Sequence, residues 1–239
     1  MIKSTFILEK NILNNFFREI IDFVLPPVCL ECEGMLKSDE KYLCQKCTSS
    51  IEKIDNSTGI VLNRLHADGL VNNAYSMFLF REGTPIQALI HALKYGQMRR
   101  IGKYYGKILG NDFRKTDNSR IDYIIPVPLH ISKKRERGYN QSDFICDGIS
   151  EAVNIQVLKK CLKRTRFTQT QTKLSREERI QNVRGAFKLR KKYVDIIKGK
   201  NVIIVDDVIT TGSTIIECAK VLKENGCGEI SVCSLALAE

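Results

Sequence analysis

The stretch Val202–Ile215, VIIVDDVITTGSTI, decides the fold. It places four apolar residues, Val202–Val205, directly before two neighbouring carboxylates, Asp206 and Asp207. An unbroken apolar run of this kind is typical of a strand that helices cover on both faces. We expect the strand to end at Val205. Because ligands of open α/β sheets bind beyond the carboxyl ends of the strands, the two aspartates are predicted to lie at a binding site.

Two neighbouring carboxylates at a strand end predict a ligand that offers them donors or positive charge, since burying them alone is costly. The 2′- and 3′-hydroxyls of a ribose are suitable donors, and Mg2+ bound to the ligand would add positive charge. A turn rich in hydroxyl groups then leads into a helix that is predicted to begin near Ile215. The residues of this turn are Thr210, Thr211, Gly212, Ser213 and Thr214.

The turn before Ile215 is a predicted phosphate site, because backbone N–H groups at a helix N-terminus bind anions and hydroxyl groups add further donors. Gly212 permits close approach of the backbone. Together with the aspartates, the turn predicts a pentose with a phosphate at one end. The alternative is a capped helix after a strand, with the aspartates as turn residues. A Walker-type loop is a poor alternative, because the turn contains no lysine.

Segments with strand and helix periodicity alternate along the rest of the chain. Strands are predicted for residues 73–80, 121–128 and 229–238. Helices are predicted for residues 85–96, 99–113, 138–153 and 214–226, the second with less support because it contains several glycines. Such alternation indicates an α/β fold with a mostly parallel sheet flanked by helices.

Four cysteines near the N-terminus form two C-x2-C pairs, Cys29 with Cys32 and Cys44 with Cys47, separated by eleven residues. Each pair directs two thiolates at one ion, and two pairs complete the tetrahedral shell that zinc prefers. Four thiolates leave no open position, so the predicted zinc is structural. Two disulfides or a redox pair are the alternatives. The other five cysteines are expected to be core or surface residues without chemistry: Cys146, Cys161, Cys218, Cys227 and Cys233.

These patterns predict four parts of the chain. They are an amphipathic helix over residues 1–27, a zinc-binding unit over 28–50, a linker over 51–70 and an α/β domain over 71–239. The first helix lies on a membrane surface or packs against protein, and its polar face of mixed charge favours packing. No apolar run reaches the roughly 18–20 residues that a membrane span requires.

Composition and charge narrow the class of protein. The 239 residues are 43% hydrophobic and 27% charged, as in soluble globular proteins. The net charge is +11, and residues 158–200 contain fifteen Lys or Arg against three Asp or Glu. Such a basic region attracts phosphates of a small molecule or a nucleic acid, although a solubilising surface is the alternative. The N-terminus does not resemble a secretory signal, so we expect the nine cysteines in a reducing cytoplasm.

Further motifs lead to a family resemblance. The stretch VIIVDDVITTGST resembles the phosphoribosyl-pyrophosphate (PRPP) loop of type I phosphoribosyltransferases. It follows PVPLHISKKRERGYNQ at residues 126–141 and KRTRFTQTQTKLSREERIQNVRGAF at residues 163–187, with the cysteine pairs in front. In this order the motifs resemble the ComF family, which includes competence proteins linked to the uptake of transforming DNA. The resemblance runs from about Val28 to the C-terminus.

The resemblance implies the type I phosphoribosyltransferase fold and roles for individual residues. Asp206 and Asp207 would bind the ribose diol, and residues 210–214 the 5-phosphate. The turn and basic residues expected at the pyrophosphate are Pro128, Leu129, His130, Lys133, Lys134, Arg135 and Arg137. Residues 164–183 would form a mobile hood over the site. Its residues that match the family pattern are Arg166, Thr168, Gln171, Arg179 and Asn182.

Two hypotheses for function follow from the resemblance. In the first, the protein binds PRPP with Mg2+ and acts in competence, with single-stranded DNA and other competence proteins, such as a helicase-like protein, as partners. In the second, it is an active phosphoribosyltransferase with an unknown nitrogenous acceptor. Thr210 stands where some purine-specific relatives have an acidic residue, which disfavours purine salvage. The sequence assigns no catalytic residue.

Overall fold

The computed structural model describes residues 27–65, 69–116, 120–166, 181 and 183–239. The chain divides into two compact units, Met1–Ser50 and Ile51–Glu239. The helix predicted for residues 1–27 and most of the predicted hood lie outside the described residues. Within the described part of the chain, none of the helices has the length and apolar character needed to cross a bilayer.

The first unit is held together by short backbone links rather than by regular sheets. An antiparallel bridge joins Val28 to Met35, and the N–H of Leu30 donates to the carbonyl of Tyr42 at 2.8 Å. Within residues 27–50, the described part of this unit, the one helix is α2 (Gln45–Ser49), and the buried apolar residues are Cys29, Leu43 and Cys47. So small a core in these residues agrees with the metal predicted from the cysteines.

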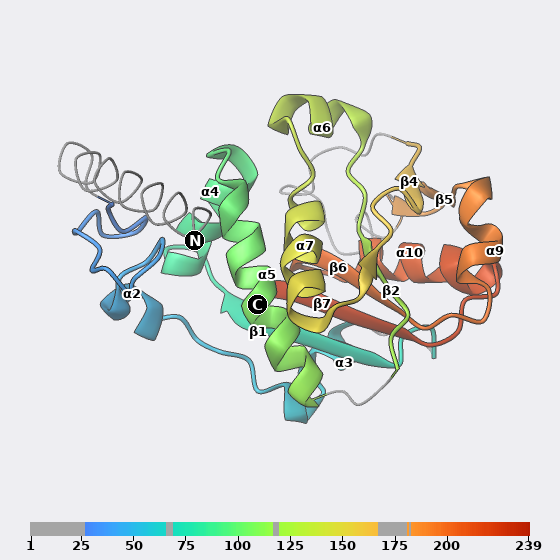
Figure 1. The fold of residues 1–239 in the computed structure, drawn as a ribbon, viewed down its shortest axis with the longest axis horizontal. Helices are drawn as coiled ribbons and strands as arrows, with labels where there is room; N and C mark the ends of the chain where they lie inside the picture. Colours follow the sequence, from blue (N-terminus) through green and yellow to red (C-terminus); the bar gives the residue numbers. More distant parts are fainter. Residues whose placement is uncertain (1–26, 66–68, 117–119, 167–180, 182) are drawn as a thin grey trace, which may run out of the picture. The chain divides into compact units, whose positions relative to one another are not determined.

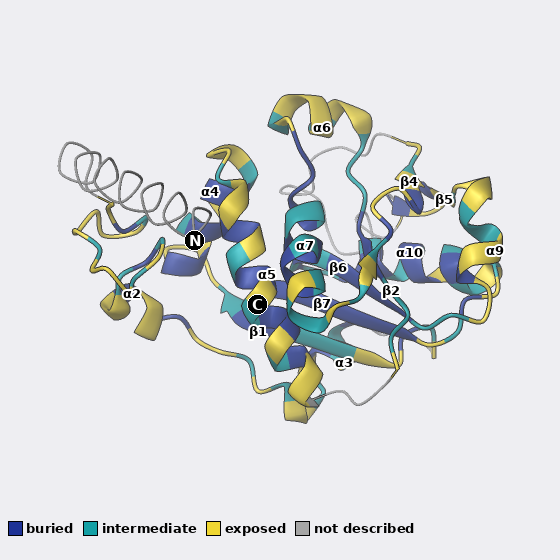
Figure 2. Ribbon diagram, viewed as in Figure 1, coloured by how far each residue is buried: buried dark blue, intermediate teal, exposed yellow. Residues whose placement is uncertain are grey.

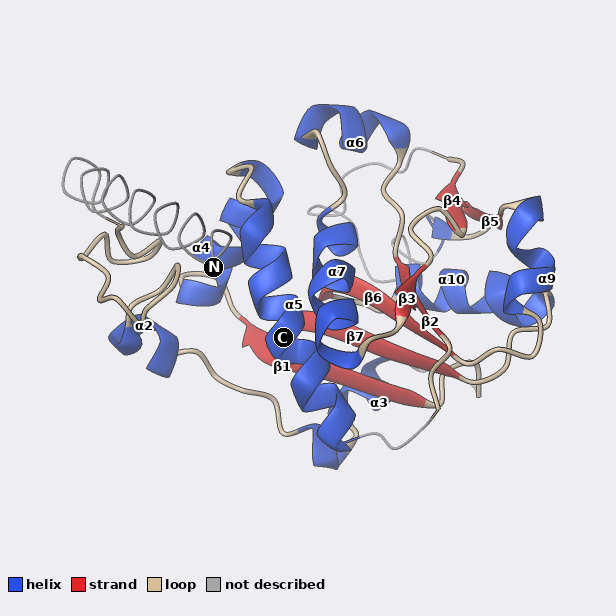
Figure 3. Ribbon diagram, in the orientation of Figure 1, coloured by secondary structure: helices blue, strands red, loops and turns tan. Residues whose placement is uncertain are grey.

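The second unit is built on a five-stranded sheet whose strand pairs are all parallel (Figures 1 and 3). In sheet order the strands are β1 (Asn73–Phe80), β7 (Ile230–Ala238), β6 (Val202–Ile209), β2 (Tyr123–Pro126) and β3 (Gln156–Val157). The predicted parallel α/β sheet is confirmed. Since every strand runs in the same direction, all five carboxyl ends meet at one edge.

Helices cover both faces of this sheet, which is why the three central strands, β7, β6 and β2, are buried along most of their length (Figure 2). One layer contains α5 (Arg99–Thr116) and α7 (Gln141–Val153), and the other contains α3 (Ile60–Leu65) and α10 (Ser213–Glu224) (Figure 1). The helix α4 (Pro85–Tyr95) follows β1. Shorter elements are the 3-10 helices η1 (Asn56–Thr58) and η3 (Lys191–Tyr193) and the helices α6 (Ile131–Arg137) and α9 (Val194–Ile197).

The glycines of α5 are explained by its close contact with α7. A Cβ atom on Gly106 would lie 2.2 Å from the carbonyl oxygen of Ile145, and one on Gly148 would lie 2.2 Å from that of Lys103. Neither distance is possible for real atoms, so the two helices approach as closely as they do only because both positions are glycine. The glycines that weaken the helix prediction therefore serve its packing.

Two predictions about the second unit are wrong. The strand β6 does not end at Val205 but continues to Ile209, because its pairing with β7 extends to Leu237. The expected linker over residues 51–70 instead contributes structure. Lys53 bridges to Phe78 of β1, and α3 buries Val61 and Leu65 in the core.

A small antiparallel hairpin was not predicted. It consists of β4 (Leu162–Arg164) and β5 (Phe187–Leu189), which flank the segment expected to form the hood. The two ends of that segment are therefore fixed side by side.

Candidate functional site

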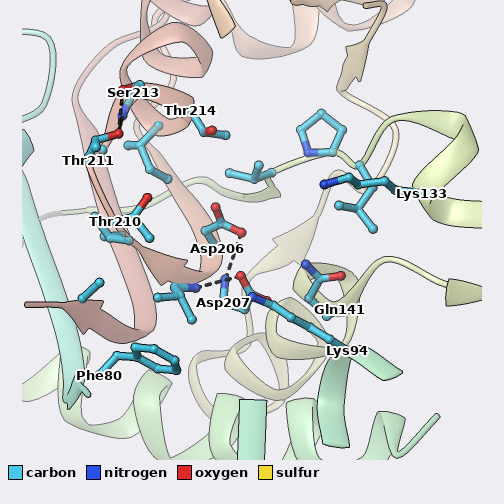
Figure 4. A pocket seen from close by; sticks show the side chains of 18 of the residues that line it. Phe80, Lys94, Lys133, Gln141, Asp206, Asp207, Thr210, Thr211, Ser213 and Thr214 are labelled. Atoms are coloured by element: carbon cyan, nitrogen blue, oxygen red, sulfur yellow. Dashed lines mark hydrogen bonds and ion pairs between the residues drawn. The ribbon is translucent and has the colours of Figure 1, made fainter. Parts of the chain in front are cut away.

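A cavity of about 470 Å3 opens at the carboxyl edge of the sheet (Figure 4). Residues from most of the surrounding elements line it. They are Phe80, Glu82, Lys94, residues 127–129, Lys133, Arg137, Gln141, Arg164, residues 206–215 and Ala238. The stretch that decides the fold thus supplies the largest continuous part of the lining. This is the place at which open parallel sheets bind ligands.

The acidic pair lies in β6 just beyond the end of its neighbour. The last residue of β2, Pro126, pairs with Val205, so Asp206 and Asp207 are the first residues of β6 without a partner on that side. The side chain of Asp206 accepts a hydrogen bond from the hydroxyl of Ser142 at 3.2 Å. The early end of β2 is therefore what exposes the pair to the cavity.

Burial raises the pKa of Asp206 to about 7, and the charge of Asp207 adds to this effect. The charge of Lys94 and the bonds from the N–H of Asp207 and the hydroxyl of Ser142 act in the opposite direction. Asp207 is buried, and its Oδ2 lies 3.0 Å from Nζ of Lys94. A ligand that brings donors or positive charge to this pair would favour its doubly ionised form.

The turn after β6 presents the backbone expected of a phosphate cradle. Gly212 has φ of +76° and is the N-cap residue of α10, so the N-cap itself offers no side chain to the first turn of that helix. The hydroxyls of Thr211 and Ser213 lie 2.7 Å apart, and the N–H of Ser213 donates to the hydroxyl oxygen of Thr211 at 3.4 Å. A Cβ on Gly212 would lie 2.8 Å from Cδ2 of Leu65 in α3. Both its backbone angle and its close neighbour thus require glycine.

The predicted pyrophosphate turn has a mixed outcome in the structure. Pro128 and Leu129 line the cavity. His130 instead serves as the N-cap of α6, where Nδ1 accepts from the N–H of Ser132 at 3.3 Å. Its ring is thereby tied to the helix end, which gives the histidine a structural role.

The basic residues after this turn divide into two groups. Lys133 and Arg137 line the cavity, whereas Lys134 and Arg135 are exposed on α6. Burial lowers the pKa of Lys133, and the neighbouring charges of Arg137 and Arg164 lower it further. A cluster of cations that repel one another in this way is a favourable site for an anion.

Only the ends of the predicted hood are described. Arg164 lines the cavity, with its guanidinium 5.3 Å from the ring centre of Phe187. Arg166 donates to the carbonyl of Arg184 at 3.0 Å, which joins the two ends of the segment. The other hood residues of the prediction lie outside the described residues: Thr168, Gln171, Arg179 and Asn182.

The four cysteines of the first unit come together in the structure. Their sulfur atoms all lie within 4.8 Å of one another, and those of Cys32 and Cys44 are 3.7 Å apart. Zinc–sulfur bonds of about 2.3 Å imply sulfurs about 3.8 Å apart in a tetrahedron, so the donor set fits this metal. Burial raises the pKa of Cys29, but backbone N–H groups, among them that of Cys44 at 3.3 Å, outweigh it and lower the pKa to about 6. A thiolate is the form that binds metal.

Comparison with known proteins agrees with this geometry. Residues 152–238 match the family of the phosphoribosyl transferase domain, and this range includes the acidic pair and the cradle. The chain is 30% identical over 222 residues to Competence protein F of Haemophilus influenzae. This alignment covers 88% of this chain and 96% of that protein. The chain belongs to the ComF family.

This ComF-family chain is also similar to a second curated protein and to solved phosphoribosyltransferase structures. It is 36% identical over 152 residues to DNA utilization protein YhgH of Escherichia coli O157:H7, covering 62% of this chain. That match spans 65% of the relative's own length. An adenine phosphoribosyltransferase structure from Leishmania donovani superposes with a TM-score of 0.39 and 12% identity, covering 69% of this chain and 84% of that one. The parallel sheet and the matched domain show the type I phosphoribosyltransferase fold.

The sequence prediction missed several residues of the cavity in this ComF-family chain. Lys94 and Phe80 come from α4 and the end of β1, far from the quoted motifs. Gln141 opens α7 and ends the quoted motif of residues 126–141, but the motif assigns it no role of its own. Their segments were predicted correctly, but their approach to β6 depends on the strand order. A lysine in the last turn of a predicted helix is common for another reason, because its positive charge interacts favourably with the helix dipole. Its position alone therefore did not indicate a site.

Proposed function

We propose that this ComF-family protein binds PRPP together with Mg2+ and acts in the handling of incoming single-stranded DNA in natural competence. The observation that supports the proposal most directly is the single cavity shared by the acidic pair and the turn before α10. Asp206 and Asp207 would accept hydrogen bonds from the ribose 2′- and 3′-hydroxyls. The hydroxyls and N–H groups of residues 210–214 would hold the 5-phosphate, each N–H contributing about 1.5–3 kcal/mol.

The diphosphate of PRPP would lie at the basic wall of the cavity. Lys133, Arg137 and Arg164 line this wall, and the turn at Pro128 and Leu129 lies next to them. Mg2+ prefers oxygen ligands and keeps several of its waters, so the oxygens of the diphosphate offer it a suitable donor set. When bound, Mg2+ would supply positive charge to the diphosphate. The protein's part is to hold the sugar and its phosphate in fixed positions.

Zinc in the first unit has a structural role in this proposal. Cys29, Cys32, Cys44 and Cys47 would fill all four positions of the metal, which leaves none for a substrate. The described residues of the unit bury only Cys29, Leu43 and Cys47 among apolar side chains, so the metal would provide most of the folding free energy of residues 27–50.

The role in DNA handling rests on two observations. The relatives named above are a competence protein and a DNA utilization protein. The chain also carries a net charge of +11, and α6 exposes Lys134 and Arg135. Such a surface binds nucleic-acid phosphates without regard to sequence. We place this activity in the cytoplasm, with other competence proteins, such as a helicase-like protein, as partners.

Calorimetry with PRPP, with and without Mg2+, tests the binding site. We expect Asp207→Asn to abolish measurable PRPP binding, because a ribose hydroxyl loses its charged acceptor. Asp195→Asn is the matched control, since Asp195 is exposed on α9. Both variants should bind single-stranded DNA as the unaltered protein does, with affinity that falls steeply with salt. Loss of DNA binding in Asp207→Asn would show that one site serves both ligands and would contradict the proposal.

A pyrophosphate-release assay against a panel of bases and oligonucleotides follows the calorimetry. Release with one acceptor would show that binding leads to transfer. Absence of PRPP binding in the unaltered protein would overturn the proposal at its first step.

A further inference from the structure

The acidic pair already has a cation of its own. Nζ of Lys94, in the last turn of α4, lies 3.0 Å from Oδ2 of Asp207. Both side chains are well covered, with exposed fractions of 23% for Lys94 and 6% for Asp207. Figure 4 shows the lysine reaching the pair from the α4 side of the cavity. An ion pair with this degree of burial is screened much less than one at the surface.

The position of Lys94 differs from that of the other cations of the cavity. The charged residues among its described lining are three acidic ones, Glu82, Asp206 and Asp207, and four basic ones, Lys94, Lys133, Arg137 and Arg164. The last three form the basic wall, where their charges act on one another. Lys94 also acts on Lys133 by its charge, but it forms an ion pair with Asp207, at the place where a divalent cation would bind two neighbouring aspartates.

Lys94 faces the oxygen of Asp207 that the backbone does not bind. Oδ1 of Asp207 accepts from the N–H of Val208 at 2.8 Å, so Oδ2 is the oxygen that faces the lysine. A carboxylate oxygen accepts two hydrogen bonds, and an ammonium group has three donors. Because Oδ2 is closed to solvent, the lysine rather than water faces it, and the ammonium group keeps donors for a phosphate oxygen.

We propose that Lys94 is a resident cation that takes the place of a divalent metal ion at the acidic pair. It neutralises Asp207 before any ligand arrives, and it excludes free metal ions from the two carboxylates. The Mg2+ that accompanies PRPP is then needed at the diphosphate only. This last consequence rests on the proposed PRPP function, whereas the exclusion of free metal ions does not. Lys94 acts as a positioning residue, since it orients and neutralises a carboxylate.

The first experiment uses Mn2+ as the probe and no PRPP. We expect the unaltered protein to show little Mn2+ binding at this site by electron paramagnetic resonance. Lys94→Gln should bind Mn2+ at least about tenfold more tightly, because two carboxylates without a counter-ion attract a divalent ion. Adding Asp207→Asn to Lys94→Gln should remove the gain. Lys103→Gln is the matched control, since it breaks a 2.6 Å ion pair with Glu151 on an exposed surface.

The second experiment measures PRPP affinity with a chelator and with saturating Mg2+. Lys94→Gln should lose about tenfold in affinity with the chelator and about threefold or less with Mg2+, while Lys94→Arg keeps most of the affinity. Lys94→Met, which keeps the length of the apolar stem, replaces Lys94→Gln if the latter does not fold. Unchanged Mn2+ affinity in the glutamine and methionine variants would overturn the proposal. Failure of the unaltered protein to bind PRPP would instead count against the proposed function, and the Mn2+ result would still decide the role of Lys94.

Discussion

The cysteine cluster and the cavity are assembled in opposite ways. The four cysteines lie within nineteen positions of one another, between Cys29 and Cys47, and they supply four identical donors. The cavity collects unlike side chains from α4, α6, α7, β4 and the ends of three strands. A metal shell needs only a short loop to close, whereas a sugar phosphate needs acids, bases and backbone amides on several sides. The first kind of site is therefore readable from a short motif, and the second only in part.

Zinc removal gives the largest expected effect and separates the two sites. Chelation, or Cys47→Ser, should unfold the first unit, because the metal contributes on the order of 10 kcal/mol to folds of this kind. We expect one zinc per chain in the unaltered protein and none after either treatment, measured together with amide exchange of residues 27–50.

Cys227→Ser is the control for zinc content, since Cys227 lies in the second unit outside the four-cysteine cluster. PRPP binding, measured with Mg2+ restored, should survive zinc removal, because the cavity is built from the second unit alone. If PRPP binding vanished with the zinc, the contrast between a local and a distributed site would be wrong.

A substitution in the cradle tests how far a local motif depends on distant residues. Gly212→Ala should weaken PRPP binding by about 30-fold or more, because alanine strains a backbone at φ of +76° and its Cβ would lie 2.8 Å from Leu65. Calorimetry should show partial recovery in Gly212→Ala with Leu65→Ala, which relieves the clash and leaves the strain. Full recovery would show that the backbone angle is unimportant, and no recovery would show that α3 plays no part.

The sequence predicts the features that one short segment forms and misses those that distant segments form together. Asp206, Asp207 and residues 210–214 were predicted as one site because they are neighbours in the chain, and all of them line the cavity. The alternation of strands and helices also predicted the parallel sheet. Such features depend on local periodicity and on the chemistry of adjacent side chains.

Features that depend on strand order were not predictable in the same way. The end of β6 at Ile209 depends on how far β7 runs beside it, and the contribution of Lys94 depends on where α4 lies. The glycines of α5 are unfavourable for an isolated helix, and only the close contact of Gly106 with Ile145 explains them. Each case involves a contact between segments far apart in the chain, for which a single sequence gives no register.

The pH dependence of stability tests Asp206, the member of the acidic pair whose pKa is raised, with a smaller expected effect. The pKa of Asp206 is raised to about 7 in the folded protein, above the ordinary value of 3.8. Between these two values the folded state therefore binds more protons than the unfolded state, so its contribution to stability falls as pH rises and becomes constant above about pH 7.

Denaturant unfolding of Asp206→Asn measures this contribution. The variant should gain stability relative to the unaltered protein as pH rises from 5 to 7, by at most about 1.4 kcal/mol per pH unit, and no further gain should follow. Asp195→Asn, on the exposed face of α9, should show no such trend. A constant difference across this range would show that Asp206 is ionised throughout, as an exposed carboxylate would be.

Substitution of the exposed basic residues of α6 should give the smallest change in PRPP affinity. It tests whether exposed and cavity-lining cations of one short helix have different roles. Lys134 and Arg135 are exposed, whereas Arg137 lines the cavity and lies 3.1 Å from Oε1 of Gln141. Replacing Lys134 and Arg135 by Gln should leave PRPP affinity within about twofold, since solvent screens such charges. DNA affinity should fall several-fold, and the slope of its logarithm against log salt should shrink by about 0.7 per lost phosphate contact. The reverse pattern, with PRPP binding lost and the salt slope unchanged, would move both residues into the pyrophosphate site that the family resemblance implies.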